Sequence, residues 1–375
     1  MNGPAWGGSE ELWSQTAMEL KAQGFRVHAS IGRRLPVHSR IHSMVEAGIE
    51  MWLRPEPYPV WKQARRALTG KTPVTLEAER LFAARRPGFV VISEGSGLPS
   101  IDLLELCVKK QLAFVLIQHA NVEWLWATDD LAKRYRTTLA AAQKCYFVSK
   151  SNQQLTEKQI GCELPNAEVV RNPFAVDFNA SPAWPRLGPE DELRFACVAR
   201  LDPTAKGQDI LLEALARPSW ADRAWRLSLY GDGPMRDSLE RLSRRLGLFN
   251  RVSLAGHVGV EEIWASNHVL VMPSRYEGLP LAMVEAMLCG RPVIATDVAG
   301  HSEVIEDGVT GFLADAPTVS SMANALERFW ARRSEARGIG AAASKSIRQL
   351  VPPDPVRVFS EKIKEEYRSA TRHHS

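Results

Sequence analysis

Residues 269–296, VLVMPSRYEGLPLAMVEAMLCGRPVIAT, constrain the fold of this chain more than any other stretch. Residues 269–272 form a continuous apolar run, which is typical of a strand buried on both faces of a parallel sheet. Pro280 suits the first turn of a helix, because its missing N–H costs nothing there, and Gly290 with Pro292 ends that helix. A second apolar run follows. This order predicts a right-handed βαβ unit in a parallel α/β sheet.

Two carboxylates in this unit are candidate binding residues. Glu277 lies in the turn before the helix, and Glu285 lies inside the helix. Open α/β sheets bind ligands at the carboxyl ends of their strands, where a helix N-terminus favours phosphate and an acidic side chain can accept hydrogen bonds from a ribose. On spacing alone, it is equally reasonable that Glu277 is a solvated turn residue and that Glu285 lies on the helix surface.

The sequence EGLPLAMVE at residues 277–285 resembles the E-x7-E motif of retaining family 4 glycosyltransferases, also described as glycosyl transferases group 1. The flanking sequences PSRYEG and CGRPVIATDVAGHSEVIEDGVTGFL are similar to that family too. The resemblance runs from about Trp6 to the end of the chain and is densest in the second half. It implies an α/β protein of the GT-B fold, with two Rossmann-like domains facing across a cleft.

The composition is that of a soluble globular protein. The chain has 375 residues, of which 45% are hydrophobic and 24% charged, and this length suits two domains. No apolar run approaches the roughly 18 residues of a membrane span. The five cysteines are scattered and form no C-x-x-C pair, which argues against a disulfide framework or a zinc site. We expect a cytoplasmic protein and leave open a position at the inner face of the membrane.

The net charge of +4 comes from the first half of the chain. Residues 1–175 hold 22 Lys and Arg against 17 Asp and Glu. This excess is compatible with an anionic partner, such as a membrane surface or a phosphorylated acceptor. Residues 61–68, WKQARRAL, suit a membrane-surface helix less well than a solvated basic helix. No basic helix with interleaved aromatic residues is present, so we expect no nucleic-acid partner.

The start of the chain departs from the family pattern. A GT-B domain opens with a buried strand that leads into a glycine-rich turn, whereas here the turn comes first, so we expect the first strand of the N-terminal domain to be missing. Gly7 and Gly8 let the backbone approach a ligand, and the family places this pair near the donor diphosphate and the acceptor. We expect Ser9 to cap a helix over residues 10–23, and a strand over residues 25–31.

His119 follows a predicted strand at residues 113–117. A histidine at that end of a parallel strand is placed to face a ligand, although one taken alone is more often structural. The resemblance implies that His119 approaches the donor sugar. The commoner family pattern has His-Asp here, and Ala120 stands in the place of that aspartate.

The domain boundary is expected at about residues 175–190, where NASPAWPRLGP is rich in proline and glycine. We therefore assign residues 1–175 to an N-terminal acceptor-side Rossmann-like domain. Residues 190–350 form a C-terminal nucleotide-sugar-binding Rossmann-like domain. A helix at about residues 355–375 is expected to cross back onto the first domain, as in GT-B chains.

Arg200 and Lys206 lie in VARLDPTAKGQDI, between a predicted strand at residues 193–198 and a helix that starts at Gln208. Such a pair can clamp a diphosphate, and the family's R-x5-K-G pattern is matched. Taken alone, two surface charges would be the more ordinary interpretation. The resemblance adds further residues near the donor: Gly231, Asp232, Val258, Gly278 and Leu279.

The resemblance implies transfer of a sugar, with retention, from a nucleotide-diphosphate-sugar to a hydroxyl of a glycan or lipid-linked acceptor. Polysaccharide, lipopolysaccharide or glycolipid assembly is the expected setting. The catalytic candidates are Glu277, His119, Arg200 and Lys206, with Glu285 on the ribose. The nucleotide-sugar is a co-substrate, and because no Asp-x-Asp motif is present we expect no obligate metal and no cofactor.

Other functions stay open at this point. A non-catalytic nucleotide-sugar-binding protein would suit a chain that lacks its first strand. A nucleotide-sugar epimerase or phosphorylase could use the same fold, although R-x5-K-G combined with E-x7-E argues against both. A dinucleotide oxidoreductase is the least supported alternative, because no G-x-G-x-x-G follows a strand.

Overall fold

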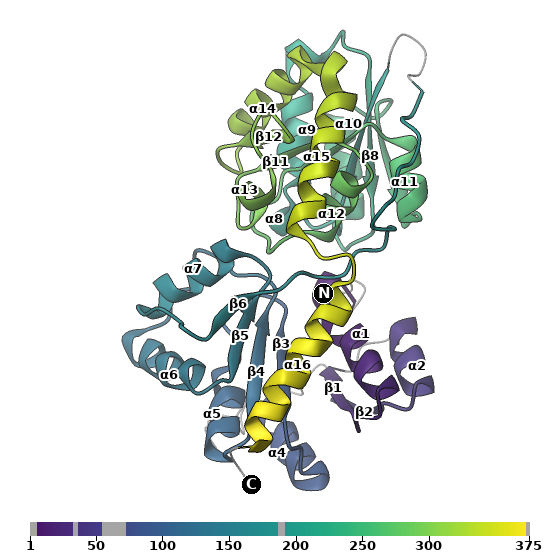
Figure 1. Cartoon of the computed structure of the whole chain (residues 1–375). Helices are drawn as coiled ribbons and strands as arrows, with labels where there is room; N and C mark the ends of the chain where they lie inside the picture. Colours follow the sequence, from purple (N-terminus) through teal and green to yellow (C-terminus); the bar gives the residue numbers. More distant parts are fainter. Residues whose placement is uncertain (1–5, 33–36, 55–72, 187–191, 373–375) are drawn as a thin grey trace. The chain divides into compact units, whose positions relative to one another are not determined.

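The computed structural model describes residues 6–32, 37–54, 73–186 and 192–372 (Figure 1). The basic segment at residues 61–68 and the end of the proline-rich linker lie outside these ranges. The chain divides into two compact units. One is Phe174–Pro353, called here the C-terminal unit. The other, the N-terminal unit, joins residues 6–173 with residues 354–372.

The C-terminal unit contains a six-stranded parallel sheet in the order β12-β11-β10-β7-β8-β9. The predicted βαβ unit is confirmed, because β10 pairs in parallel with β11 and every residue of both strands is buried. The strand order reverses beside β7 and β10, and loops at such a point form ligand sites in open α/β sheets. The strands are β7 (Leu193–Val198), β8 (Trp225–Tyr230), β9 (Val252–Gly256), β10 (Val269–Met272), β11 (Val293–Thr296) and β12 (Gly311–Ala314).

Helices cover both faces of this sheet, and each face has its own apolar core (Figure 1). One core gathers Phe195, Trp220 and Phe329, and the other gathers Trp264 and Met287. The helices are α8 (Pro203–Lys206), α9 (Gln208–Leu215), α10 (Arg236–Arg245), α11 (Val260–Ser266), α12 (Leu281–Leu288), α13 (His301–Val304), α14 (Val319–Ala331) and α15 (Ala336–Leu350), with short 3-10 turns at Pro218–Trp220 and Arg333–Glu335.

The N-terminal unit contains two separate parallel sheets among its described residues. One has two strands, β1 (His28–Gly32) and β2 (Glu50–Arg54). The other has the order β3-β4-β5-β6, with β3 (Val90–Glu94), β4 (Phe114–Gln118), β5 (Lys144–Phe147) and β6 (Ala167–Val169). The helices are α1 (Gly8–Ala22), α2 (Ser39–Glu46), α4 (Pro73–Arg85), α5 (Ile101–Lys109), α6 (Asp129–Ala140) and α7 (Lys150–Ile160).

The last helix, α16 (Pro355–Arg372), packs on this N-terminal unit (Figure 1). Its Phe359 and Ile363 share an apolar cluster with Leu12 of α1 and Val115 of β4. Of the helices that the structure describes, none has the length and apolar character needed to span a bilayer. All five cysteines are free thiols.

Two local predictions near the start of the chain are wrong. Helix α1 starts at Gly8 with Gly7 as its N-cap, because the Glu10 carboxylate accepts from the Gly7 N–H at 2.9 Å. The Ser9 hydroxyl donates to that same carboxylate and so does not cap the helix. The first strand starts at His28 rather than Phe25, because the Phe25 N–H still closes the end of α1 on the Leu20 carbonyl at 3.1 Å.

We expect His268, just before β10, to make the C-terminal unit sensitive to acid. Its ring is fully buried, Nδ1 accepts from the Arg194 N–H at 3.0 Å, and Nε2 lies 3.2 Å from the Pro185 carbonyl. This pairing requires the neutral ring. Burial, with the Arg194 charge nearby, lowers the pKa of His268 to about 4.

Between pH 6.5 and 4, we expect His268 to remove about 3 kcal/mol of stability from the C-terminal unit. The sign of this effect follows from the lowered pKa of His268 in the folded chain. Below pH 6.5, His268 becomes protonated in the unfolded chain but stays neutral in the folded chain, so a falling pH favours unfolding. His268→Gln keeps an acceptor and a donor but does not titrate. Urea midpoints at pH 7.5 and 4.5 should therefore differ less for the variant, and equal differences in both proteins would contradict the assignment.

Candidate functional site

Gly207 brings the loops after β7 and β10 together. It joins α8 to α9 with φ of 65°, and a Cβ atom built on it would lie 1.9 Å from the Pro273 carbonyl oxygen. Only glycine tolerates that approach. The loop that carries Lys206 is therefore held against the loop that carries Glu277.

Lys206 and Glu277 form an ion pair at this junction. Lys206 Nζ lies 2.6 Å from Glu277 Oε1, and the Ser274 hydroxyl donates to the same oxygen at 2.8 Å. The Glu277 side chain is 8% exposed and that of Lys206 24%. Two predicted site residues thus meet, 71 positions apart in the chain, where neither is a free surface charge.

Arg200 lies in the same turn but holds a different carboxylate. Its Nη2 donates to Asp202 Oδ2 at 2.5 Å, and the Thr204 hydroxyl donates to the other oxygen. Burial raises the pKa of Asp202, but the hydrogen bonds from Thr204 and Arg200 outweigh it, so the net pKa is lowered. Asp202 is therefore ionised at neutral pH. The Arg200 side chain is 47% exposed and can contact a ligand.

An ion pair between Arg275 and Asp209 also fixes the loop after β10. Arg275 donates to both oxygens of Asp209 at 2.7 Å each, and its N–H donates to the Ala205 carbonyl at 2.8 Å. Paired parallel bonds of this kind are geometrically specific as well as strong. The sequence interpretation overlooked both residues, although Arg275 lies in the PSRYEG flank that carries the resemblance.

His301 also lies in this neighbourhood, and the sequence interpretation overlooked it. It is fully buried at the start of α13, and its Nδ1 lies 2.6 Å from the Thr296 carbonyl. Burial lowers its pKa, opposed by the nearby Glu277 charge and by the Thr296 carbonyl. Its Nε2 is buried and finds no hydrogen-bond partner in the described part of the chain. Buried polar atoms are usually hydrogen-bonded, so this nitrogen can form a hydrogen bond with a bound ligand.

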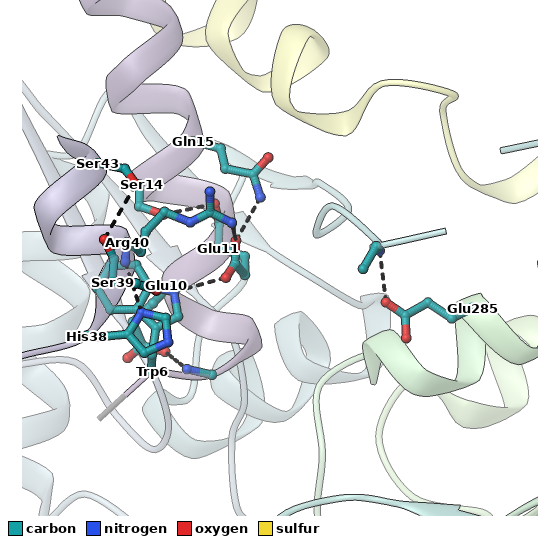
Figure 2. A network of polar contacts seen from close by, with 12 residues as sticks. Trp6, Glu10, Glu11, Ser14, Gln15, His38, Ser39, Arg40, Ser43 and Glu285 are labelled. Carbon is teal, nitrogen blue, oxygen red and sulfur yellow. Dashed lines mark hydrogen bonds and ion pairs between the residues drawn. The ribbon is translucent and has the colours of Figure 1, made fainter. Parts of the chain in front are cut away.

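Glu285 lies inside α12 and is 5% exposed. Its Oε1 accepts from the Ala175 N–H at 2.9 Å (Figure 2). Burial raises its pKa, and the Ala175 hydrogen bond opposes that rise. No partner is found for Oε2 among the described residues. The surface-helix interpretation of Glu285 is therefore wrong.

The remaining predicted donor residues lie in the turns after β8, β9 and β10. Gly231 is required by geometry, because its φ is 114° and an added Cβ would lie 2.3 Å from the Ala199 carbonyl oxygen. Asp232 accepts from the Gly233 N–H at 2.9 Å. Val258 packs partly against the core. The Gly278 carbonyl accepts from the Gly300 N–H, and the Leu279 side chain is 6% exposed, so Leu279 can offer a ligand only its backbone.

The glycine turn of the N-terminal unit is stiffened by a polar network around Glu11 (Figure 2). Glu11 accepts from the Trp6 indole at 2.9 Å, from Gln15 at 2.7 Å and from Arg40 of α2 at 2.9 Å. The Gly7–Gly8 turn is thereby fixed between α1 and α2. This network joins residues that lie 29 positions apart in the chain.

His119 lies in the N-terminal unit directly after β4, as predicted, but is 5% exposed. Its Nε2 lies 3.1 Å from the Ser93 hydroxyl. Burial lowers the pKa of His119 to about 4, against an opposing contribution from the Asn172 side chain. The ring is neutral at pH 7, so it can donate or accept one hydrogen bond at each nitrogen but carries no charge.

Comparisons with known proteins identify relatives. Residues 192–332 match the family model described as glycosyl transferases group 1. The chain is 35% identical over 228 residues to the alpha-D-kanosaminyltransferase of Streptomyces kanamyceticus, covering 57% of this chain and 58% of that protein. It is 34% identical over 168 residues to the GDP-mannose-dependent alpha-(1-6)-phosphatidylinositol monomannoside mannosyltransferase of Mycolicibacterium smegmatis, covering 41% of this chain and 43% of that protein. The matches thus span about half the length of these relatives.

Among solved structures, Anabaena Alr3699/HepE in complex with UDP aligns with a TM-score of 0.70 at 20% identity, covering 96% of each chain. Sucrose-phosphate synthase of Thermosynechococcus elongatus aligns with a TM-score of 0.69 at 18% identity, covering 96% of this chain and 92% of that one. These likenesses show the predicted GT-B fold.

Proposed function

We propose that this chain, which belongs to the glycosyl transferases group 1 through residues 192–332, moves a sugar from a nucleotide-diphosphate-sugar to an acceptor hydroxyl with retention at the anomeric carbon. Family 4 membership and a role in polysaccharide, lipopolysaccharide or glycolipid assembly are part of this proposal. The observation that carries it is the Lys206–Glu277 pair, in which Glu277 is buried and Lys206 half-buried, at the carboxyl ends of β7 and β10.

Lys206 and Arg200 supply positive charge where the leaving diphosphate gathers negative charge. Each is paired here with one carboxylate, Glu277 or Asp202, so the turn is close to neutral before a donor binds. A bound diphosphate would add negative charge to the turn and would compete with Glu277 and Asp202 for the two cations. Fixed cations aimed at developing charge are an effective form of electrostatic catalysis, because they need not reorganise during the reaction.

The other residues suit the sugar and the nucleoside. Glu285 keeps Oε2 for the ribose hydroxyls while Oε1 holds Ala175. Glu277 orients the donor sugar, and we add the buried Nε2 of His301, whose Nδ1–H donates to the Thr296 carbonyl, as an acceptor for a sugar hydroxyl beside it. If the leaving phosphate accepts the acceptor's proton, no side chain is needed as a strong base. The approach of His119 to the donor sugar stays a prediction.

Melting temperatures measured with UDP, GDP and ADP test the proposal first. A ligand that binds only the folded chain must raise the melting temperature. One relative is a GDP-mannose-dependent enzyme and one structural neighbour was solved in complex with UDP, so both bases belong in the panel. A shift with one nucleotide, followed by release of that nucleotide only when acceptor is added, supports a transferase. A shift without turnover on any acceptor favours a non-catalytic binding protein.

Glu285→Gln should weaken binding of that nucleotide by about tenfold to a hundredfold, since a hydrogen bond to a charged group contributes about 1.5–3 kcal/mol. The amide oxygen still accepts from Ala175, so the unfolding midpoint should change little. Glu262→Ala, an exposed carboxylate of α11, is the matched control and should leave affinity unchanged. Equal affinity for the Glu285 variant and the parent would remove Glu285 from the site.

A further inference from the structure

A chain of buried hydrogen bonds in the C-terminal unit ends on Glu277. The Thr296 hydroxyl donates to the Ser274 carbonyl at 2.6 Å, and the Ser274 hydroxyl donates to Glu277 Oε1 at 2.8 Å. On the other side of Thr296, the Nδ1–H of His301 donates to the Thr296 carbonyl at 2.6 Å. We call these bonds, in the order His301–Thr296–Ser274–Glu277, the hydrogen-bond chain. It connects the two side chains that the proposed function assigns to the donor sugar.

The parallel sheet brings Thr296 beside Ser274. Strands β10 and β11 pair with Met272 opposite Ala295, so Ser274 and Thr296 follow closely after two paired residues. Thr296 is the last residue of β11 and also pairs with β12 on its other side. A β-branched threonine has few side-chain rotamers, so the direction of its hydroxyl is set by the strand that carries it. The hydrogen-bond chain is therefore anchored in the sheet.

Burial leaves the hydroxyl groups of this chain no alternative partners in solvent. Thr296 and His301 are fully buried, and Ser274 is 1% exposed. A serine hydroxyl has a single proton, and that of Ser274 goes to Glu277. Because a buried donor that loses its acceptor costs free energy, Ser274 holds this bond persistently.

Both protein donors to Glu277 bind the same carboxylate oxygen. Oε1 accepts from Lys206 Nζ at 2.6 Å and from the Ser274 hydroxyl, whereas no partner is found for Oε2 among the described residues. The terminal torsion of a glutamate is broad, so Glu277 does not fix the plane of its own carboxylate. Two donors on Oε1 fix that plane and leave Oε2 for a hydroxyl of a ligand.

The two donors respond differently when a diphosphate binds. Lys206 is a half-buried cation, so a bound phosphate competes with Glu277 for it. Ser274 is uncharged and buried, and its proton is already committed to Glu277. Ser274 therefore continues to hold Oε1 at the stage when Lys206 is drawn toward the phosphate.

We propose that Ser274 and Thr296 are positioning residues for the donor sugar, because the hydrogen-bond chain keeps Glu277 Oε2 directed at a sugar hydroxyl after the diphosphate has drawn Lys206 away. This inference rests on the proposed transferase function. Neither residue contacts the donor. Ser274 acts through Glu277, and Thr296 acts through Ser274.

A purely structural role for these bonds makes a different prediction. Their loss would then destabilise the C-terminal unit and weaken the binding of a nucleotide and of its nucleotide-sugar to the same extent. A positioning role affects the sugar part of the donor, because Glu277 is assigned to the sugar. The two roles are separated by the ratio of the dissociation constant of a nucleotide-sugar to that of its nucleotide, called here the sugar ratio.

The test compares Thr296→Val with Thr296→Ser. Valine keeps the shape of threonine without its hydroxyl, whereas serine keeps the hydroxyl without the methyl group. Calorimetry with UDP, UDP-glucose, UDP-galactose, GDP and GDP-mannose measures the sugar ratio for the nucleotide-sugar that the parent binds most tightly. We expect Thr296→Val to raise the sugar ratio about threefold to tenfold, with affinity for the nucleotide within about twofold of the parent. Thr296→Ser should return the sugar ratio toward that of the parent.

A second variant and a matched control complete the design. Ser274→Ala removes the bond to the charged carboxylate and should raise the sugar ratio about tenfold. The control is Thr310→Val. Thr310 is 3% exposed, its hydroxyl oxygen accepts from the Glu306 N–H at 2.8 Å, and it precedes β12 at the amino end of that strand. Its substitution should lower the urea midpoint of the C-terminal unit but leave the sugar ratio unchanged.

The proposal is wrong if Thr296→Val and Ser274→Ala both keep the parent's sugar ratio. It is also wrong if Thr296→Ser is as impaired as Thr296→Val, because packing of the methyl group would then explain the effect, or if Thr310→Val raises the sugar ratio equally. A parent that binds a nucleotide but none of the nucleotide-sugars would show that Glu277 holds no sugar. A parent that binds none of the nucleotides would instead overturn the proposed function, and this inference with it.

Discussion

Lys206→Ala should lower turnover by about a hundredfold to a thousandfold and also destabilise the C-terminal unit. The first effect follows from removing one fixed positive group from the developing phosphate charge. The second follows from burial, because Glu277 would lose its ion-pair partner while its side chain is only 8% exposed. Removing one partner of a buried ion pair lowers the free energy of unfolding by about 3–5 kcal/mol. Steady-state kinetics and urea midpoints measure the two effects on the same sample.

The two effects can be separated by a second substitution. Lys206→Met combined with Glu277→Gln leaves no buried charge, so most of the stability should return while turnover stays low. Arg244→Ala breaks an exposed pair with Glu240 on α10 and should change neither quantity. Turnover of Lys206→Ala within a few-fold of the parent would contradict the catalytic role. A double variant that remained as unstable as Lys206→Ala would contradict the ion-pair explanation.

The sequence predicted those parts of the fold that short-range patterns determine. The strand at Val269–Met272, the helix after Pro280 and the strand ending at Thr296 all follow from apolar runs and from the positions of proline and glycine. The same holds for β7, where the predicted and observed bounds agree. Buried parallel strands read as continuous apolar runs, so the sheet could be predicted without knowing its strand order.

The site could be predicted only in part, because it depends on contacts between distant residues that no local sequence pattern encodes. Spacing indicated Lys206 and Glu277 separately, but their pairing depends on how close the two loops lie. Asp202 and His301 were overlooked because an aspartate and a histidine in a loop have no periodic signal. Arg291 is another such residue: it is 2% exposed, yet it donates to the carbonyls of Trp264, Asn267, Cys289 and Ala183.

Helix caps also escaped the sequence interpretation for a physical reason. Ser9 has the side chain preferred at an N-cap, but Glu10 satisfies the Gly7 N–H instead and draws the Ser9 hydroxyl to itself. The first helical residue is therefore Gly8. Several side chains compete for the same few N–H groups at a helix start, and the outcome depends on geometry that the sequence alone does not specify.

Gly207→Ala should destabilise the C-terminal unit by more than about 3 kcal/mol and abolish the nucleotide-dependent rise in melting temperature. A left-handed backbone costs a non-glycine residue roughly 1–2 kcal/mol by itself. Here the added Cβ would also lie 1.9 Å from the Pro273 carbonyl oxygen, and backbone cannot yield as a flexible side chain can. Relief of that overlap must separate Lys206 from Glu277, so stability and nucleotide binding should fall together.

Gly247→Ala separates the steric overlap from the backbone strain. Gly247 also has a left-handed backbone, with φ of 73°, but a Cβ atom there would meet nothing within 4 Å. Its substitution should therefore cost only the roughly 1–2 kcal/mol of strain and leave nucleotide binding intact. Urea midpoints of the C-terminal unit, compared for both variants and the parent, measure the difference. Equal costs would mean that the loops after β7 and β10 do not pack as closely as Gly207 requires, and the assembly of the Lys206–Glu277 pair would then need another cause.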